Sequence, residues 1–554
     1  MSLPVFSTQT ELFSIAGLTR SLFGPTDRYR LFAQKIYPVL VATRAQLAQC
    51  YCADDGRAAI EPVLLLGLTY LQYLEGMPDR QAIEMLKYHA GWNFALNRQV
   101  GDSLCHPTTL VNFRQRLVGR DLGALGFTAV LEALIDAGLL ARQSRQRLDS
   151  TQMFGRVSRM SRLDCVRESL RLALQELAGP LAAAARPEWW PRVWERYVES
   201  QTDYRASLET LANKLVLAGT DTQLVLGWLA QPEGRALAAG PQVQLLTRVF
   251  AEQYEVLPAT AALQPQTKEQ LDSGRVQNPH DPDATYAAKG QGEHKKEHVG
   301  YKVQVAETVT ETVLAPGEPT DNFITGIVTH AARESDEAGA QKMEAEQAAM
   351  GLAKPTVHYV DAAYISTQEL RRAAAEGREL IGPAPGAGGK NGGCFGSDRF
   401  DVRVEERQAV CPGGHPNTQC SRLLEQATGR VSFRFEWNDA LCGPCALRLQ
   451  CMKKEQSHRT LTVGEHHAIL QARRREQQTE AFKERMKHRN AIEGTQSELV
   501  RAHGLRRARY RGLAKAKLQN YFAGAACNLK RWLRRLAWQL QQELAGRVAQ
   551  AASA

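Results

Sequence analysis

Two aspartates stand where strand-like runs end, and their positions predict a site for a divalent metal ion. Asp149 closes the run RLD, and Asp361 closes the run HYVD. At the carboxyl ends of strands in an open α/β sheet, side chains point into the crevice where ligands bind. A carboxylate there is poorly solvated unless it meets a cation, so two of them favour a hard ion such as Mg²⁺. Because Asp is also a common turn and cap residue, either one alone is compatible with a structural role.

A basic helical segment near the end of the chain adds a third acidic residue. Arg489 and Glu493 are four residues apart and share one helical face, as a plain surface ion pair also would. Basic residues with interleaved tyrosines follow, and such a surface suits the neutralisation of phosphates. From it we choose three candidates for DNA contacts: Arg507, Arg511 and Lys515.

Six of the eleven cysteines fall within the 58 residues from Cys394 to Cys451. In an intracellular chain, such a cluster indicates metal binding before disulfides. The C-G-P-C knuckle can present two thiolates to one ion, and a tetrahedral Zn²⁺ needs two more ligands from elsewhere. We therefore predict a structural Zn²⁺ held by four thiolates: Cys411, Cys442, Cys445 and Cys451. His415 and Cys420 are competing ligands, and reduced thiols without metal are the alternative.

The charge of the 554-residue chain is concentrated at one end. Residues 471–554 contain 19 Lys and Arg against 6 Asp and Glu, whereas the preceding 470 residues contain 50 against 53. A local excess of this size favours a polyanion as partner, and an acidic protein or a membrane surface fits it less well. The sequence shows no secretory signal and no apolar run long enough to cross a membrane. We expect a cytoplasmic protein.

The elements that must position these residues follow an α/β pattern. We expect a strand at 355–361, a helix at 366–376 and a strand at 379–383, which together form a unit with parallel neighbouring strands. A strand pair is expected within 298–322, with alternate residues on one face, and a helix over 331–350. Residues 161–267 have a helical pattern, as expected for a module inserted into the core.

Residues 29–135 predict helix after helix, with a short Gly-containing break at 76–79. This order is compatible with a helix-turn-helix reader of DNA, although on this stretch alone a plain helical bundle is the favoured interpretation. The candidate recognition helix is 106–117. On it we expect three exposed DNA-contacting residues: Asn112, Arg114 and Arg116.

Together, three short motifs resemble the D, D, E signature of bacterial insertion-sequence transposases. They are LDST at Leu148–Thr151, VDAAY at Val360–Tyr364 and RNAIE at Arg489–Glu493. The segment GLRRARYRGLAKAKLQ and the later NLKR at Asn528–Arg531 look like the tail of that signature in one large subgroup. The helical stretch after residue 60 is similar to the N-terminal domain of the same subgroup. The resemblance spans roughly residues 30–155 and 275–535.

The resemblance implies an RNase H-like nuclease core with two Mg²⁺ ions, replaceable by Mn²⁺, between three carboxylates. Asp149, Asp361 and Glu493 match those ligand positions, with Asp361 as the bridging ligand. Arg489 would hold Glu493 in place or touch the cleaved strand. Similar Cys-rich inserts in the subgroup support the structural Zn²⁺. The chain departs from the family pattern at Met486 and Val500, where a Tyr and a Lys are common.

The expected fold class is thus α/β: an RNase H-like core, a mixed sheet flanked by helices, that carries a helical N-terminal domain, a helical insertion and a small zinc-ribbon-like insertion. The expected boundaries are a helical DNA-binding domain at 1–135, core segments at 136–160 and 276–385, the helical insertion at 161–275, the Cys-rich insertion at 386–462, and the C-terminal core helix and basic region at 463–554.

The expected function is a DNA transposase that binds the ends of its element, cleaves phosphodiesters and joins strands to target DNA. Double-stranded DNA is the expected partner, at the bacterial nucleoid, with a homodimer in the active complex and no membrane contact. Two alternatives stay open at this point. One is a DNA-binding protein that has lost its chemistry, and the other is a hydrolytic endonuclease.

Overall fold

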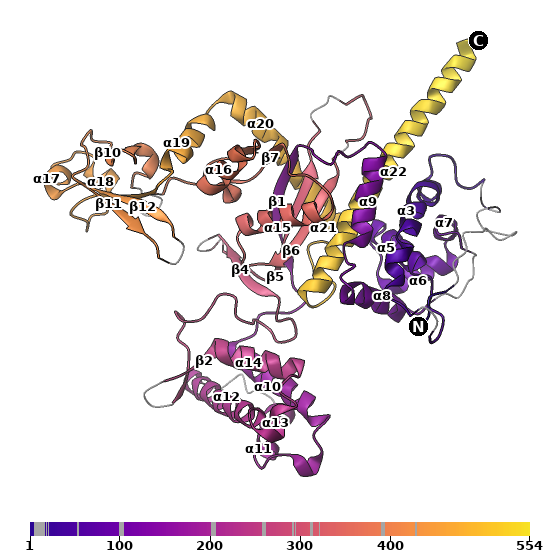
Figure 1. The fold of residues 1–554 in the computed structure, drawn as a ribbon, viewed down its shortest axis with the longest axis horizontal. Helices are drawn as coiled ribbons and strands as arrows, with labels where there is room; N and C mark the ends of the chain where they lie inside the picture. Colours follow the sequence, from indigo (N-terminus) through magenta and orange to yellow (C-terminus); the bar gives the residue numbers. More distant parts are fainter. Residues whose placement is uncertain are drawn as a thin grey trace.

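The computed structural model describes most of the chain. The described residues are 1–4, 17, 19, 21–52, 55–98, 105–200, 207–257, 262–290, 293, 295–310, 314–320, 322–388, 394–426 and 429–553. Within these ranges, every helix is too short or too polar to span a membrane. The molecule combines a mixed central sheet with many helices, so the α/β fold class is confirmed (Figure 1).

The central sheet has six strands. They are β1 (Gln146–Phe154), β4 (Thr285–Lys289), β5 (Lys296–Thr308), β6 (Ile324–Ala331), β7 (Val357–Tyr359) and β8 (Glu379–Ile381). Its order is β4-β5-β1-β7-β8, and β6 pairs with β5 on the edge away from β1. The β5 pairings with β1, β4 and β6 are antiparallel, whereas β1-β7 and β7-β8 are parallel. The parallel unit predicted for 355–383 is therefore present, with α16 (Thr367–Ala375) as its crossover helix.

One continuous apolar core joins the N-terminal helices to this sheet. The helices before β1 are α2 (Arg28–Leu31), α3 (Tyr37–Ala42), α4 (Arg44–Ala48), α5 (Pro62–Leu74), α6 (Asp79–Tyr88), α7 (Ala90–Ala95), α8 (Pro107–Gly119) and α9 (Leu125–Asp136), with a π-helical turn, Phe32–Ile36, between α2 and α3. The long helix α22 (Leu513–Ser553) runs between these helices and the sheet (Figure 1). Buried side chains of α5, α9, α22 and β5 belong to the same cluster. The N-terminal helices are therefore packed onto the central sheet rather than separated from it.

The helical insertion after β1 forms a lobe with its own core (Figure 1). Its elements are α10 (Arg162–Ala178), α11 (Trp190–Trp194), α12 (Leu208–Leu229), α13 (Pro232–Arg235), α14 (Pro241–Gln253), β2 (Tyr254–Val256) and β3 (Leu263–Pro265), with short 3₁₀ and π turns at Ala183–Ala185 and Glu195–Glu199. Trp190 stacks on Trp194 inside this lobe, with ring centroids 5.7 Å apart. The chain enters the lobe from the end of β1 and returns from it to β4.

The Cys-rich segment projects from the sheet on the side opposite the N-terminal helices (Figure 1). It contains β9 (Asp401–Arg403), β10 (Gln408–Val410), β11 (Gln419–Leu424), β12 (Val431–Glu436), β13 (Thr460–Gly464) and the single-turn helices α17 (Asp439–Cys442) and α18 (Arg448–Cys451). Phe400, Phe435 and Trp437 form the centre of its small core. The chain then returns to the sheet through α19 (His467–Glu476), α20 (Glu480–Asn490) and α21 (Ile492–Ala502), and α15 (Asp336–Ala349) packs on β5 and β6.

Candidate active site

The register of the central sheet brings two of the candidate carboxylates to one level. In the parallel pair of β1 and β7, Arg147 stands opposite Tyr359. Asp149 and Asp361 each follow two residues later. Because side chains alternate between the faces of a strand, a step of two keeps both residues on one side. Asp361 leaves the strand and caps the turn Ala362–Tyr364 with its side chain.

The guanidinium of Arg489 lies where three carboxylates converge. Its Nη2 donates a hydrogen bond to Asp149 Oδ2 at 2.9 Å and lies 3.7 Å from Asp361 Oδ2. Its Nη1 lies 3.9 Å from Glu493 Oε1. The structure thus brings together all four residues that the sequence singled out for this site.

Two helices that meet almost in line present Arg489 and Glu493 to the sheet. The junction residue Ala491 has a φ of −67° and a ψ of −14°, which are helical values, so positions i and i+4 stay on one face. The Glu493 side chain is 71% exposed and that of Asp361 50%, whereas that of Asp149 is 15% exposed. The site is therefore closed at Asp149 and open to solvent on the Glu493 side.

The balance of charge in this site favours additional cations. Burial raises the pKa of the Asp149 carboxyl, the Arg489 guanidinium opposes that rise, and Asp361 adds to it. One guanidinium faces three carboxylates, so negative charge remains that further cations would neutralise. Carboxylate oxygens are the ligands that Mg²⁺ and Mn²⁺ prefer, and this set of donors therefore fits such ions.

A buried ion-pair network holds the helices of the site against the sheet. Glu307 on β5 is fully buried and pairs with Arg147 Nε at 2.6 Å and with Arg531 Nη1 at 3.0 Å. The Thr495 hydroxyl on α21 donates to Glu307 at 2.7 Å, and Arg147 also donates to the carbonyl of His488 at 2.9 Å. These bonds connect β1, β5, α20, α21 and α22. They therefore fix the position of α20 and α21, and with it that of Arg489 and Glu493, relative to the sheet.

We expect Glu307→Gln to lower the free energy of unfolding by about 3–5 kcal/mol, because it removes the counter-charge of the buried Arg147 and one of the two carboxylate partners of Arg531. Urea titration of the wild type and the variant measures this difference. The control is Glu543→Gln, the same change at the solvent-exposed end of α22, which should leave the unfolding midpoint unchanged. A loss below about 1 kcal/mol, as for a surface pair, would contradict the role given to this network.

The NLKR segment on α22 is hydrogen-bonded to the start of β6. The Asn528 side chain accepts a hydrogen bond from the Ile324 N–H and donates one to the Ile324 carbonyl, both at 2.8 Å. It therefore satisfies the backbone of β6 as a neighbouring strand would. Nothing in the local sequence pattern indicated this role, because the two residues are 204 positions apart.

One further cluster of metal-type donors was not predicted from the sequence. The donor atoms of Glu498, His503 and Cys527 lie within 4.8 Å of one another, the one such group among the described residues. Glu498 already pairs with Lys530 at 2.8 Å and with Arg531 at 3.0 Å. Burial raises the pKa of Glu498, but these two cations outweigh burial and hold it at about 2. A cation would have to displace them, so we assign the cluster to the ion-pair network.

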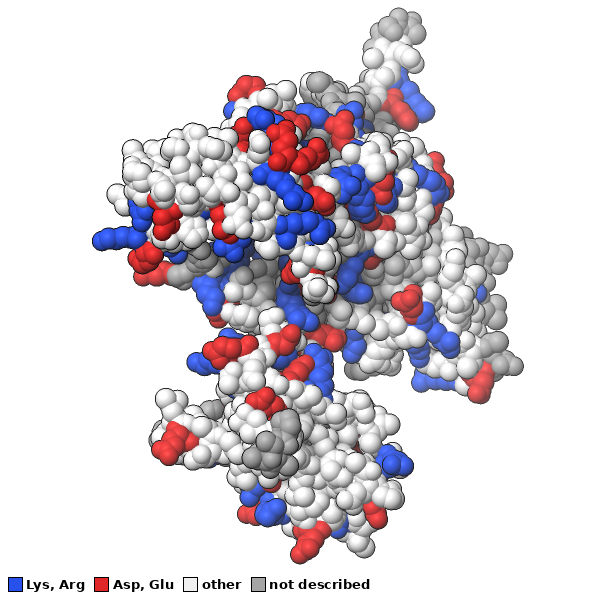
Figure 2. All heavy atoms as spheres, turned by 60° about the vertical axis from the view of Figure 1, so that its left-hand side comes forward, with Lys and Arg blue, Asp and Glu red and all other residues white. Residues whose placement is uncertain are grey.

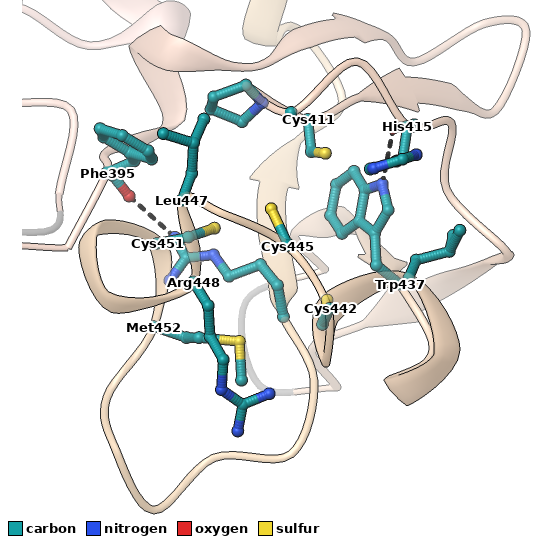
Figure 3. A pocket seen from close by; sticks show the side chains of 14 residues that line it. Phe395, Cys411, His415, Trp437, Cys442, Cys445, Leu447, Arg448, Cys451 and Met452 are labelled. Atoms are coloured by element: carbon teal, nitrogen blue, oxygen red, sulfur yellow. Dashed lines mark hydrogen bonds between the residues drawn. The ribbon is translucent and has the colours of Figure 1, made fainter.

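The four predicted zinc ligands line one small cavity in the Cys-rich segment. Cys411, Cys442, Cys445 and Cys451 surround a space of about 20 Å³, enough for one ion or water molecule (Figure 3). Burial raises the pKa of the Cys451 thiol to about 11, and the other three cysteines add to the rise. Four thiols are the donor set of a structural Zn²⁺. No three of their Sγ atoms lie within 4.8 Å of one another, so the side chains would have to draw together around a bound ion.

The same cavity distinguishes the two competing ligands. His415 lines it, and its carbonyl accepts a hydrogen bond from Trp437 Nε1 at 2.9 Å (Figure 3). Cys420 lies on β11 opposite Phe435 and is not among the lining residues. His415 therefore remains a candidate to replace one of the four thiolates, whereas Cys420 does not line this cavity.

The candidate recognition helix α8 differs from the prediction at one residue. Asn112 is exposed, and Arg116 is half-buried with its guanidinium 4.9 Å from the Tyr51 ring centroid. The predicted exposure of Arg114 is wrong. Its side chain is 5% exposed and donates two hydrogen bonds to Asp79, because Arg114 falls on the same helical face as the buried apolar residues of α8. It ties α8 to α6 and is not placed to read bases.

The predicted phosphate contacts after α21 are all exposed or half-exposed: Arg507, Arg511 and Lys515. Lys515 shares a shallow pocket of about 50 Å³ with Val111 and Gln115 of α8. The basic segment and the candidate recognition helix are therefore neighbours on the surface, although about 400 residues separate them in the sequence.

Two protein-family models match this chain. The family described as transposase domain (DUF772) matches residues 20–116, which end within α8. The family described as transposase DDE domain matches residues 410–533, which contain the cysteine cavity, Arg489, Glu493 and the NLKR segment. A search of curated proteins gave no significant match.

Proposed function

Because this chain belongs to the DDE transposases of insertion sequences, we propose that it binds the ends of its element, cleaves phosphodiester bonds there and joins the resulting 3′-hydroxyls to target DNA. The proposal depends above all on the placement of Asp149, Asp361 and Glu493 around one guanidinium, that of Arg489, beside a mixed sheet. The antiparallel β5-β1 pair beside the parallel β1-β7 and β7-β8 pairs supports an RNase H-like core.

In the proposed site, these three carboxylates would hold two Mg²⁺ ions, for which Mn²⁺ could substitute. Such a pair of ions, when bound, activates the attacking oxygen and stabilises the leaving oxygen of an in-line phosphodiester displacement. Asp361, whose side chain is 50% exposed, would be the ligand that both ions share. Asp149, held at its Oδ1 by the Ser150 N–H, keeps a fixed orientation on β1.

We assign Arg489 two roles. Its contacts link Asp149, at 2.9 Å, to Glu493, at 3.9 Å, and its guanidinium, on a side chain that is 16% exposed, can contact a phosphate oxygen of the cleaved strand. Metal-dependent cleavage of duplex DNA by the purified protein tests the function as a whole. A dimer is the expected active form, because an element has two ends to be cut.

DNA recognition is expected to divide between two surfaces. Arg507→Ala with Arg511→Ala should weaken binding to every duplex alike and reduce its salt dependence, because these residues would neutralise phosphates. Asn112→Ala should remove the preference for element ends over random duplex, at about 1–3 kcal/mol per lost base contact. Affinities for both duplexes at several salt concentrations measure the two effects. Equal losses on both duplexes for Asn112→Ala would mean that α8 belongs to a plain helical bundle.

A further inference from the structure

An arginine-lined cavity lies at the joint between the helical insertion and the rest of the molecule. It has a volume of about 300 Å³, and part of its wall is the first turn of α10. Its polar lining residues are Arg159, Ser161, Arg162, Gln253, Arg275 and Gln277. Three of these six residues are permanently cationic, so the cavity does not suit an apolar ligand.

Two of the three guanidinium groups have no carboxylate within ion-pair distance among the residues that the structure describes. Arg162 donates to the Gln253 side chain at 2.8 Å and to two backbone carbonyls, and Arg275 donates to the carbonyl of Asp272 at 3.0 Å. Burial lowers the pKa of Arg162, and the charge of Arg275 lowers it further. Holding like charges together at a partly buried site is costly unless an anion offsets them.

The surrounding groups offset only part of this positive charge. Ser161 caps α10, a 17-residue helix, so the positive end of the helix dipole faces the cavity. Two carboxylates lie beside the cavity: Asp164, in the first turn of α10, accepts a hydrogen bond from the Ser161 hydroxyl, and Glu252 accepts one from the Val276 N–H and pairs with Arg248. Glu297 lies 3.9 Å from Arg159 and offsets only that charge.

The cavity lies near the basic segment that follows α21. The Phe154 N–H donates to the carbonyl of Arg506, and the Ala508 N–H donates to the carbonyl of Phe154, so this segment lies beside the end of β1. The Arg156 side chain donates to the carbonyl of Arg509 at 2.7 Å. From there three residues lead to Arg159 at the cavity. Basic side chains, with acidic ones among them, are visible at this narrow joint (Figure 2).

We propose that this cavity binds a phosphate group of the DNA backbone, so that a strand engaged at the carboxylate site is gripped again at the helical insertion. The inference rests on the proposed function for its source of phosphate. Guanidinium groups match phosphate oxygens in a bidentate manner, and a helix N-terminus adds donors of the same kind. The helical insertion would thus hold DNA at a distance from the site of cleavage.

The test compares the full-length wild type with Arg275→Gln and with Arg192→Gln, an equal charge change at an exposed position of the insertion outside the cavity. Two quantities are measured: the thermal midpoint in inorganic phosphate against chloride at equal ionic strength, and duplex affinity as a function of salt. We expect phosphate to stabilise the wild type and Arg192→Gln but not Arg275→Gln. The salt slope of Arg275→Gln should fall by about 0.9 for each lost phosphate contact.

If Arg275→Gln loses the phosphate response but keeps the wild-type salt slope, the site takes a free phosphate or a small phosphorylated molecule, and the assignment to DNA is overturned. If the three proteins respond alike in both measurements, no phosphate site exists. Loss of the proposed function would appear separately, as absence of metal-dependent cleavage by the wild type, and the phosphate measurement would still decide the cavity.

Discussion

Asp361→Asn should reduce DNA cleavage by more than about a hundredfold, the loss that already follows from changes in residues that only support metal ligands. The Asp361 carboxylate lies beside the Arg489 guanidinium, which also contacts Asp149 and Glu493, and we assign it as a ligand of both metal ions. Binding to duplex DNA should stay nearly unchanged, because metal ligation and phosphate contacts involve different residues. Cleavage assays in Mg²⁺, Mn²⁺ and Ca²⁺, with binding measured in parallel, give both quantities. Activity is expected in the first two ions only.

A matched control is available on α20. Glu480→Gln removes the same charge from a side chain that is 89% exposed and pairs only with Lys483 among the described residues. The Glu480→Gln variant should cleave DNA like the wild type. Strong cleavage by Asp361→Asn would refute the assignment of the carboxylates. Adding target DNA to the same reactions separates two activities, since a transposase yields joined products and a hydrolytic nuclease yields only cut ones.

Cys445→Ser should release the structural zinc and unfold the Cys-rich segment. The small core around Phe435 and Trp437 is the main apolar support of this segment, so a bound Zn²⁺ would supply much of its folding free energy. Metal analysis should find about one zinc per wild-type chain and none in the variant. Limited proteolysis should then cut the variant within residues 394–464 while the central sheet stays resistant.

Cys420→Ser serves as the control for this experiment, because Cys420 does not line the cavity of the other four cysteines. It should keep both the zinc and the resistance to protease. Wild-type protein without zinc whose Cys-rich segment still resists protease would show that reduced thiols and the apolar core suffice there.

The local sequence pattern predicts secondary structure best where buried residues follow a regular spacing. Tyr301, Val303 and Val305 alternate along β5 and are fully buried on one face, as the sequence predicts. The predicted position of the partner strand, within 298–322, is wrong: β6 begins at Ile324 and extends to Ala331, where the pattern predicts the start of a helix. A fully buried strand such as β6 carries no alternation, so its local pattern does not distinguish it from a helix.

The sequence by itself determined the chemistry of this protein: which carboxylates, thiols and basic residues are present, and which of them share a strand end, a helical face or a knuckle. These properties depend on spacings of a few residues. Only the tertiary structure decided that Asp149 and Arg489, 340 residues apart, form an ion pair. Only the tertiary structure also decided that the parallel register of β1 and β7 places Asp149 and Asp361 next to each other across the sheet. It also buried Arg114 against Asp79 and gathered three arginines around one cavity. Such contacts depend on how distant elements pack. The free energy of that packing comes from the whole core, so no local sequence pattern predicts it.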